Sequence, residues 1–295
     1  MRAWTVPALL VVPMMLAAQE DTTRIQTIPV AKGVYMLLGN GGNIGVSAGE
    51  DAVFLVDDQF APLTQKIIDA VKAISDTPIR FLLNTHWHFD HTGGNENFGK
   101  VGVVIVAHDN VRQRMSVEQF MARMNRRFPP SPKAALPVVT FSEMVTFHLN
   151  GDDIHAVHVK NAHTDGDALV HWVNANVIHM GDTFMNGFYP FIDIGSGGSI
   201  NGLITAITAA MSYVNDGTKI IPGHGPLAVK ADLVAYRDML VGVRDAVQRL
   251  VAQKKTLEQV LAANPTAPWD DKWGRGFMKP ADFLTTVYES LTKRP

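Results

Sequence analysis

The sequence predicts an α/β protein arranged as a four-layer αβ/βα sandwich. Two blocks of short, apolar, strand-like segments lie in different halves of the chain, and segments with helical spacing accompany each block. Several metal-binding side chains come directly after strand-like segments, beside glycine. Two sheets packed face to face, with helices on their outer faces and a site along one edge of the strands, satisfy all three observations.

The first block begins with hairpins. Residues 28–56 alternate between strand-like runs and glycine-rich turns at 39–42 and 49–51, which favours antiparallel pairing. A helix follows, with Pro62 suited to its first turn. Its apolar side chains recur every three to four residues, at Leu63, Ile67, Val71 and Ile74. This spacing predicts a helix with one buried face.

Beyond this helix, the first block continues with two buried strands, at 79–83 and 103–107. Residues 110–124 have the spacing of a helix. Three prolines within 126–132 prevent that helix from continuing, so we expect an exposed loop there.

The second block contains further strand-like segments, at 138–145, 153–159, 168–173 and 176–180. Asn201 is expected to cap the helix that follows them. Residues 220–221 then form a short strand. We expect these strands to build the second sheet.

The C-terminal part is helical. Apolar side chains keep a helical spacing through 233–250. Thr256 and Gln259 form a capping box, and Pro280 opens the last helix. We expect these late helices to cover a sheet.

The composition is that of an ordinary globular protein. Of 295 residues, 46% are hydrophobic and 18% are charged, and the formal net charge is -2. The chain is long enough for a large core. It has no long basic run, so nucleic acid is not an expected partner. We expect a small-molecule partner instead. The sequence does not indicate an oligomeric state.

Residues 1–18 have the features of a secretory signal peptide, with Arg2 before an almost wholly apolar run and two small residues at the end. The run is too short to span a bilayer, and Pro7 and Pro13 interrupt it, so no stable membrane anchor is expected. The chain has no cysteine, which excludes disulfides, thiolate ligands and a lipidated cysteine. We expect a periplasmic or secreted protein in which residues 19–295 form a single domain.

Four side chains able to bind a metal ion lie within six residues: His86, His88, Asp90 and His91. Alternate side chains of an extended stretch share a face, so the first two lie together, and a turn brings the other two beside them. Imidazole with carboxylate suits zinc or a neighbouring first-row metal, whereas oxygen ligands alone would indicate magnesium or calcium. A transition-metal site is therefore predicted, with zinc as the first expectation. The alternative is a polar loop whose histidines only make hydrogen bonds.

Three other segments place a histidine or aspartate beside glycine after an apolar run. They contain His163, Asp182 and His224. Glycine allows the tight backbone paths that a loop-built site requires. Each segment alone is a weak indication.

In this order, the seven positions resemble the pattern of the metallo-β-lactamase superfamily, which is H-x-H-x-D-H, then a histidine, then an aspartate or cysteine, then a histidine. The resemblance runs from about residue 28 to residue 225 and leaves the C-terminal helices outside. It implies a sandwich of the metallo-β-lactamase type, two zinc ions per chain and hydrolysis by zinc-activated water.

The resemblance also implies a role for each ligand. The first zinc would be held by His86, His88 and His163, the second by Asp90, His91 and His224, and Asp182 would bridge the two. Asp90 would also orient the hydroxide for attack on a carbonyl. Histidine rather than glutamate at position 88 resembles the zinc hydrolases of the superfamily and not its di-iron branch.

The chain departs from the cysteine-bearing β-lactamases at two positions. Asp182 stands where they have a thiolate, and Met185 stands where they have a lysine for the substrate carboxylate. The aspartate resembles the site of glyoxalase II and the lactonases. Export favours a penicillin-type β-lactam as the substrate. A lactone, ester or thioester hydrolase is the alternative, and a non-catalytic zinc-binding protein is a lesser one.

Two further expectations concern the surroundings of the metals. Metal-bound histidines usually donate their second nitrogen to a carboxylate or a carbonyl, and Asp57 is the expected carboxylate, with Asp58 as the second choice. An apolar wall beside the metals is expected from Phe184, Phe188 and Tyr189. Ordinary core packing is the alternative for these aromatic residues.

Overall fold

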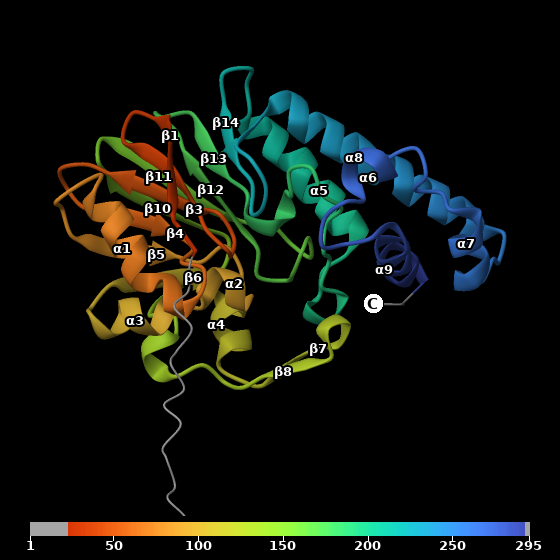
Figure 1. Ribbon diagram of the computed structural model, residues 1–295, viewed down its shortest axis with the longest axis horizontal. Coiled ribbons are helices and arrows are strands. Elements are labelled where there is room, and N and C mark those ends of the chain that lie inside the picture. Colours follow the sequence, from red (N-terminus) through yellow and green to blue (C-terminus); the bar gives the residue numbers. More distant parts are fainter. Residues whose placement is uncertain (1–22, 293–295) are drawn as a thin grey trace, which may run out of the picture.

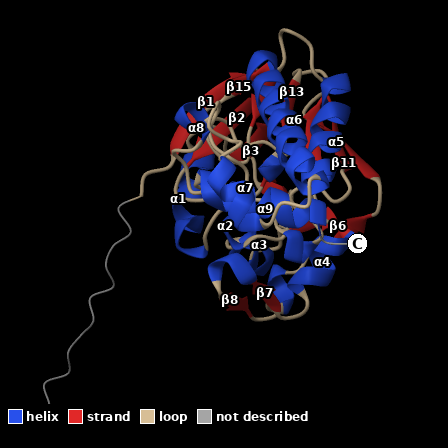
Figure 2. Cartoon of the chain, turned by 90° about the vertical axis from the view of Figure 1, so that its right-hand side faces the viewer, coloured by secondary structure: helices blue, strands red, loops and turns tan. Residues whose placement is uncertain are grey.

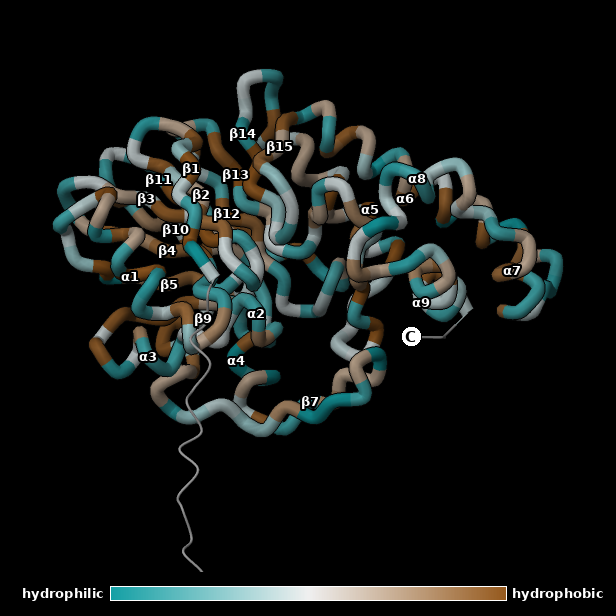
Figure 3. Tube along the Cα trace, in the orientation of Figure 1, coloured by the Kyte–Doolittle hydropathy of each residue, from teal (hydrophilic) through white to brown (hydrophobic). Residues whose placement is uncertain are grey.

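The structure is a computed structural model that describes residues 23–292. Two β-sheets pack face to face, and helices cover the outer face of each sheet (Figure 1). Apolar side chains from both sheets fill the space between them and form the central core. The hydropathy of the trace shows the same pattern, with the apolar segments concentrated in the strands (Figure 3). The predicted four-layer sandwich is confirmed.

The first sheet has antiparallel and parallel halves. Its strands, in spatial order, are β1 (Gln26–Ala31), β2 (Val34–Leu38), β3 (Ile44–Ala48), β4 (Val53–Val56), β5 (Ile79–Leu83), β6 (Val104–His108) and β9 (Val139–Phe141). Strands β1 to β4 pair antiparallel, and β4, β5, β6 and β9 pair parallel. Parallel neighbours end at the same edge of the sheet, so the loops after β4 and β5 lie together.

Short helices accompany the first sheet. They are α1 (Thr64–Lys72), α2 (Phe89–Thr92), α3 (Asn95–Lys100) and α4 (Asp109–Met115). The helix predicted after Pro62 is α1, and it buries Ile67 and Val71 against the outer face of the sheet. This apolar layer is separate from the central core.

The second sheet carries the long helices. Its strands are β10 (Met144–Leu149), β11 (Asp152–His158), β12 (Ala168–Trp172), β13 (Val177–His179), β14 (Lys219–Ile221) and β15 (Ala228–Val229). The helices of this half are α5 (Ile200–Ala210), α6 (Lys230–Ala252), α7 (Leu257–Ala263), α8 (Asp270–Trp273) and α9 (Pro280–Thr292). Side chains of α5, α6 and α9 share one core with the sheet, and Figure 2 shows these helices gathered on one side of the molecule. The expected cover of late helices is present.

The prediction of a single helix over 110–124 is wrong beyond Met115, where α4 ends. The chain instead forms a hairpin of β7 (Gln119–Met121) and β8 (Arg126–Phe128), joined by a turn in which Asn125 is left-handed, with φ 46°. Apolar residues at helical spacing do not distinguish a helix from a hairpin that packs one face on a neighbouring loop. The exposed loop expected over 126–132 therefore begins only after β8.

Two boundaries in the second half also differ from expectation. The segment 138–145 is not one strand, because β9 completes the first sheet and β10 begins the second. The cap of α5 is Ser199, whose hydroxyl accepts a hydrogen bond from the Gly202 amide at 3.0 Å, and not Asn201. Serine and asparagine are comparable caps, so sequence alone does not separate neighbouring candidates.

Two predicted helix starts are confirmed. Thr256 and Gln259 form a capping box at the start of α7, and Pro280 is the first residue of α9. Within residues 23–292, no helix has the length and apolar character needed to cross a bilayer. The expected signal peptide, residues 1–18, lies outside the described residues.

Candidate metal centre

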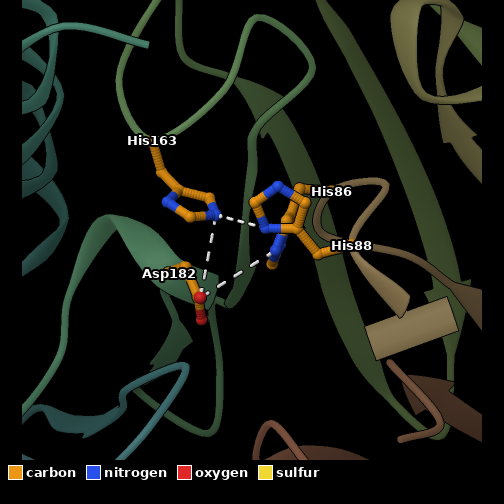
Figure 4. A group of neighbouring side chains, drawn as sticks. All are labelled: His86, His88, His163 and Asp182. Carbon is orange, nitrogen blue, oxygen red and sulfur yellow. Dashed lines mark hydrogen bonds and ion pairs between the residues drawn. The ribbon is translucent and has the colours of Figure 1, made fainter. Parts of the chain in front are cut away.

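The structure brings all seven predicted ligands together from loops and short helical turns that follow four strands. These strands are β5, β11, β13 and β14. The donor atoms form two groups, and within each group they lie within 4.8 Å of one another. We call His86, His88, His163 and Asp182 the inner group (Figure 4) and Asp90, His91 and His224 the outer group.

Asp182 lies between the two groups and faces each of them with a different oxygen. Its Oδ2 is 3.9 Å from His86 Nε2 and 3.7 Å from His163 Nε2. Its Oδ1 is 3.1 Å from His91 Nε2 and 3.5 Å from His224 Nε2. This is the placement required of a carboxylate that bridges two cations.

A chain of hydrogen bonds fixes the ring of His86. The Thr85 hydroxyl donates to Asp57 Oδ2 at 2.8 Å, and so it accepts from His86 Nδ1 at 3.0 Å. In a neutral imidazole the other nitrogen then carries the lone pair. That nitrogen, His86 Nε2, is buried and has no hydrogen-bond partner among the described residues. It points an unused donor atom into the centre.

The rings of His88 and His163 face each other with unprotonated nitrogens. His88 Nε2 donates to Asp193 Oδ2 at 3.1 Å, and His163 Nδ1 donates to the Phe191 carbonyl at 2.7 Å. The remaining nitrogens, His88 Nδ1 and His163 Nε2, are 2.9 Å apart. Two lone pairs at this distance repel each other unless a cation draws on both.

The outer group is held partly by the same carboxylate. Asp57 Oδ2 accepts from His91 Nδ1 at 2.7 Å, which directs His91 Nε2 toward Asp182. Asp57 itself is left-handed, with φ 65°. His224 Nε2 is 3.3 Å from Asp90 Oδ2. Asp57 thus occupies the position expected of it.

Asp58, the second choice for this role, makes no hydrogen bond to a ligating imidazole within residues 23–292. Its Oδ1 accepts a hydrogen bond from the Gly94 amide at 2.9 Å, and its backbone amide donates to the His91 carbonyl at 3.0 Å. Burial raises its pKa well above the usual value. Asp58 therefore stabilises the backbone of the histidine loop, whereas Asp57 orients the ring of His91.

Glycines leave room for two of the ligands. A Cβ at Gly42 would clash with the His91 ring, and a Cβ at Gly223 would clash with Asp182 Oδ1. The Gly42 amide also donates to the Asp90 carbonyl at 2.9 Å, which ties the glycine-rich turn to the histidine loop. These close approaches explain the glycines near the predicted ligands.

Two of the inner histidines, His86 and His163, are neutral at physiological pH. Burial, followed by the neighbouring His88, lowers the pKa of His163 to about 4. Burial and the charge of His91 hold the pKa of His86 well below its usual value. A neutral imidazole offers a lone pair, so these rings need not lose a proton to bind a cation.

The outer group is dominated by opposite charges. Burial disfavours ionised Asp90, but the charge of His91 and a hydrogen bond from His224 outweigh it and lower the pKa of Asp90 to about 2. Burial also opposes protonation of His91, yet Asp182 and other carboxylates raise its pKa above the usual value. The carboxylates are thus ionised, and their negative charge favours protonation of the nearby imidazoles. A bound metal cation would take the place of these protons.

The residues fit a pair of divalent cations. His86 Nε2 is buried without a hydrogen-bond partner among the described residues, and Asp182 Oδ1 is buried between the imidazole nitrogens of His91 and His224. Four imidazoles direct unprotonated or exchangeable nitrogens at carboxylate oxygens, and no lysine or arginine of residues 23–292 lines the cavity beside them. Imidazole and carboxylate donors with no thiolate suit zinc and its neighbours.

The centre forms the floor of a cavity of about 320 Å³ with largely apolar walls. The walls are Phe89, Met121, Met124, Met185, Phe188, Tyr189, Phe191, Phe277 and Met278. Two of the predicted wall residues, Phe188 and Tyr189, are therefore present. Phe184 is not, because it is fully buried and packs on Tyr236 with ring centroids 5.0 Å apart. Core packing, the alternative for the aromatic residues, applies to Phe184.

Sequence reasoning missed several contributors to the centre. Asp193 follows no strand and caps the 3-10 helix Ile194–Ser196, so its glycine-rich surroundings read as a turn, yet it accepts hydrogen bonds from both His88 and the Ser196 hydroxyl. Burial opposes its ionisation, but the bond from His88 lowers its pKa to about 2. Phe277 and Met278 belong to the segment before α9, so the C-terminal part also shapes the cavity.

Comparison with known proteins agrees with this geometry. The family model of the metallo-beta-lactamase superfamily matches residues 38–238. The solved structure of the DIM-1 metallo-beta-lactamase has 15% sequence identity and a TM-score of 0.59, and the match covers 74% of this chain and 97% of that one. A metallo-beta-lactamase from Pontibacter korlensis has 17% identity and a TM-score of 0.60, over 74% of this chain and 99% of that one.

A longer match extends into the C-terminal helices. The stereoselective inverting sec-alkylsulfatase Pisa1 from Pseudomonas sp. has 16% identity and a TM-score of 0.68. The match covers 90% of this chain but 50% of the alkylsulfatase, so the present chain spans about half the length of that protein. At these identities the three structures establish a shared fold.

Proposed function

Because the chain belongs to the metallo-β-lactamase superfamily, we propose that this metal-dependent hydrolase holds two zinc ions and opens the amide ring of a penicillin-type β-lactam. The convergence of seven ligand side chains, divided into two groups by Asp182, carries the proposal. A complete set of ligands argues against a non-catalytic zinc-binding protein. The cavity volume, about 320 Å³, suits a small molecule.

We assign one cation to each group. His86, His88 and His163 would hold the first, Asp90, His91 and His224 the second, and Asp182 would contact both. When bound, such a pair lowers the pKa of water to roughly 7 and stabilises negative charge on a substrate oxygen.

The protein's own side chains then position the reactants. Asp90 lines the cavity, and its low pKa keeps it ionised, so its carboxylate would accept a hydrogen bond from the attacking water and hold it toward the carbonyl. Asp57 and Asp193 fix the rings of His91 and His88, so the centre needs little rearrangement during the reaction. The apolar walls keep bulk water away from the reacting bond, which strengthens the electrostatic interactions inside the cavity.

A lactone, ester or thioester hydrolase is the second candidate. Its support is the apolar lining of the cavity, together with Met185 at a position where a lysine would bind the carboxylate of a β-lactam. The likeness to the sec-alkylsulfatase adds a sulfate ester of an alkyl alcohol to this class.

We also propose that the enzyme acts outside the cytoplasm, as a single catalytic domain formed by residues 19–295. The support is the composition of residues 1–18. Fractionation of the native host, with the protein detected in periplasm and medium, would test this; retention in the cytoplasm at full length would contradict it.

A substrate panel separates the candidate activities. The zinc-loaded protein is assayed against a chromogenic β-lactam, an aryl ester, a lactone and a thioester, each with and without a chelator. The proposal expects chelator-sensitive turnover with the highest kcat/KM for the β-lactam. A higher value for an ester or lactone would transfer the assignment to the second candidate, and turnover of none would contradict a hydrolase of either class.

A further inference from the structure

The hairpin of β7 and β8 has two different faces. Its register pairs Gln119 with Phe128, Phe120 with Arg127 and Met121 with Arg126. Directly opposed residues in an antiparallel pair point to the same face, and neighbouring pairs alternate. Met121 lines the cavity and is buried, so Arg126 lies on the cavity face of the hairpin, while Arg127 lies on the outer face.

Ring contacts place the exposed Arg126 beside one lining residue of the cavity. Its guanidinium carbon lies 5.3 Å from the ring centroid of Phe89 and 4.8 Å from that of Phe128. Phe89 lines the cavity and separates the ligands His88 and Asp90 in the chain. Stacking on two rings that are themselves stacked, with centroids 5.0 Å apart, restrains the guanidinium at the edge of the cavity.

Arg126 also differs from its neighbours in having no acidic partner. Arg123 pairs with Asp282 at 2.5 Å, and Arg127 pairs with Glu118 at 2.6 Å. Among residues 23–292, no carboxylate lies within 4.0 Å of the Arg126 guanidinium. Its hydrogen-bond donors therefore remain available to a ligand.

Arg126 is not itself a lining residue, but it lies over the ring of Phe89, which is one. Among the residues that the structure describes, no lysine or arginine lines the cavity, and its walls are methionine and aromatic side chains. A substrate with a carboxylate would find no fixed positive group on these walls.

We propose that Arg126 binds a carboxylate of the substrate at the edge of the cavity, away from the bond that is cleaved. This inference rests on the proposed function and assigns its substrate class: acyl compounds with an apolar body and one carboxylate. The planar guanidinium offers two parallel N–H donors that match the two carboxylate oxygens. The rest of the substrate would then lie along the apolar walls and place its carbonyl over the floor.

Kinetics on a matched pair of substrates test the assignment. A penicillin-type β-lactam and its carboxyl methyl ester differ by the anionic group alone. Arg126→Gln is expected to lower kcat/KM for the free carboxylate roughly 10- to 100-fold and to leave the methyl ester within about twofold. Arg126→Lys keeps the charge and should recover part of the loss. Arg127→Gln, on the outer face, is the matched control and should change neither value.

A binding measurement decides the point even if neither compound is hydrolysed. Calorimetry on the zinc-loaded protein compares 4-phenylbutanoate with the neutral 4-phenylbutanamide. The wild type should bind the carboxylate at least about tenfold more tightly, and Arg126→Gln should remove most of this preference. A preference that persists in Arg126→Gln would overturn the proposal, because the metal ions would then bind the carboxylate. An equal loss for both substrates, or no loss, would also overturn it. If neither substrate is hydrolysed, but the wild type prefers the carboxylate and Arg126→Gln loses this preference, only the proposed β-lactamase activity is contradicted.

Discussion

The two halves of the metal centre are built from similar ligands but are held very differently. In the inner group every side chain is at most 4% exposed. In the outer group Asp90 is 22% exposed and His224 is 29% exposed, although His91 is fully buried. Each inner imidazole has its second nitrogen fixed by a side chain or a carbonyl, whereas no such partner is found for His224 among the described residues.

This difference shows how one centre combines firm metal binding with access for a substrate. Rings that are already oriented lose little freedom when a cation binds, and burial shields the cation from water. The half-open group instead faces the cavity, where a substrate and water must enter. We therefore expect the inner group to bind metal more tightly and the outer group to exchange it more readily.

The largest effect is expected from the loss of an inner ligand. His163→Ala should remove the inner cation and, because Asp182 contacts both groups, weaken the outer one. Turnover should fall at least about a thousandfold, since metal stabilisation worth several kcal/mol is lost. Metal analysis by plasma mass spectrometry and steady-state kinetics measure this. Full metal content together with near-normal turnover would contradict the assigned role.

Loss of an outer ligand should have a smaller and more selective effect. His224→Ala should reduce the metal content from two ions to one, with turnover lowered roughly 10- to 100-fold and the inner cation retained. The same metal analysis applies, with circular dichroism to verify folding. Loss of both ions would show that the two groups depend on each other and would break the proposed asymmetry.

Asp193→Asn tests the support of the inner group without removing a ligand. Loss of the carboxylate that orients His88 should weaken inner-site affinity by about tenfold, at the lower end of the usual range for such partners. Asp165→Asn is a suitable control, because the Asp165 carboxylate pairs with Arg114 and, among the described residues, makes no hydrogen bond to a ligand side chain. A chelator competition assay measures both variants. If the two lose affinity equally, the effect belongs to the fold and not to the ring of His88.

The smallest effect is expected on the pH dependence of folding stability, through a pair of histidines outside the metal centre. His108 and His158 stack with centroids 3.6 Å apart, and burial lowers the pKa of both. Below pH 6.5 the unfolded chain therefore binds more protons than the folded one, and stability falls as the pH is lowered. His158→Gln should make this fall shallower. Urea unfolding at pH 5, 6 and 7, with chelator present for both proteins, measures it; an unchanged slope would contradict the linkage.

The ligands and the fold were accessible from the sequence because both leave local patterns. A histidine cluster directly after the apolar strand 79–83, and histidine or aspartate beside glycine, mark the ends of strands. The alternation of two strand blocks with helices was sufficient for the four layers. Asp57 was recognisable for the same reason, because it follows β4 directly.

Features that depend on distant packing were not accessible. Asp193 becomes a partner of His88 only through a loop 105 positions further along the chain. The β7–β8 hairpin matched a helical pattern, since nothing local shows that Met121 and Phe128 pack near the histidine loop. Likewise, Phe184 and Phe188 are equally apolar in the sequence, and only the fold sends one into the core and the other to the cavity.

Calorimetric titration of the metal-free protein with Zn²⁺ tests directly whether the centre has two metal sites of different affinity. We expect two ions per chain with affinities at least about tenfold apart, and in His224→Ala the loss of the weaker site alone. A single site in the wild type, or two sites of equal affinity that both disappear in His224→Ala, would contradict the division into a firmly held inner group and an open outer one.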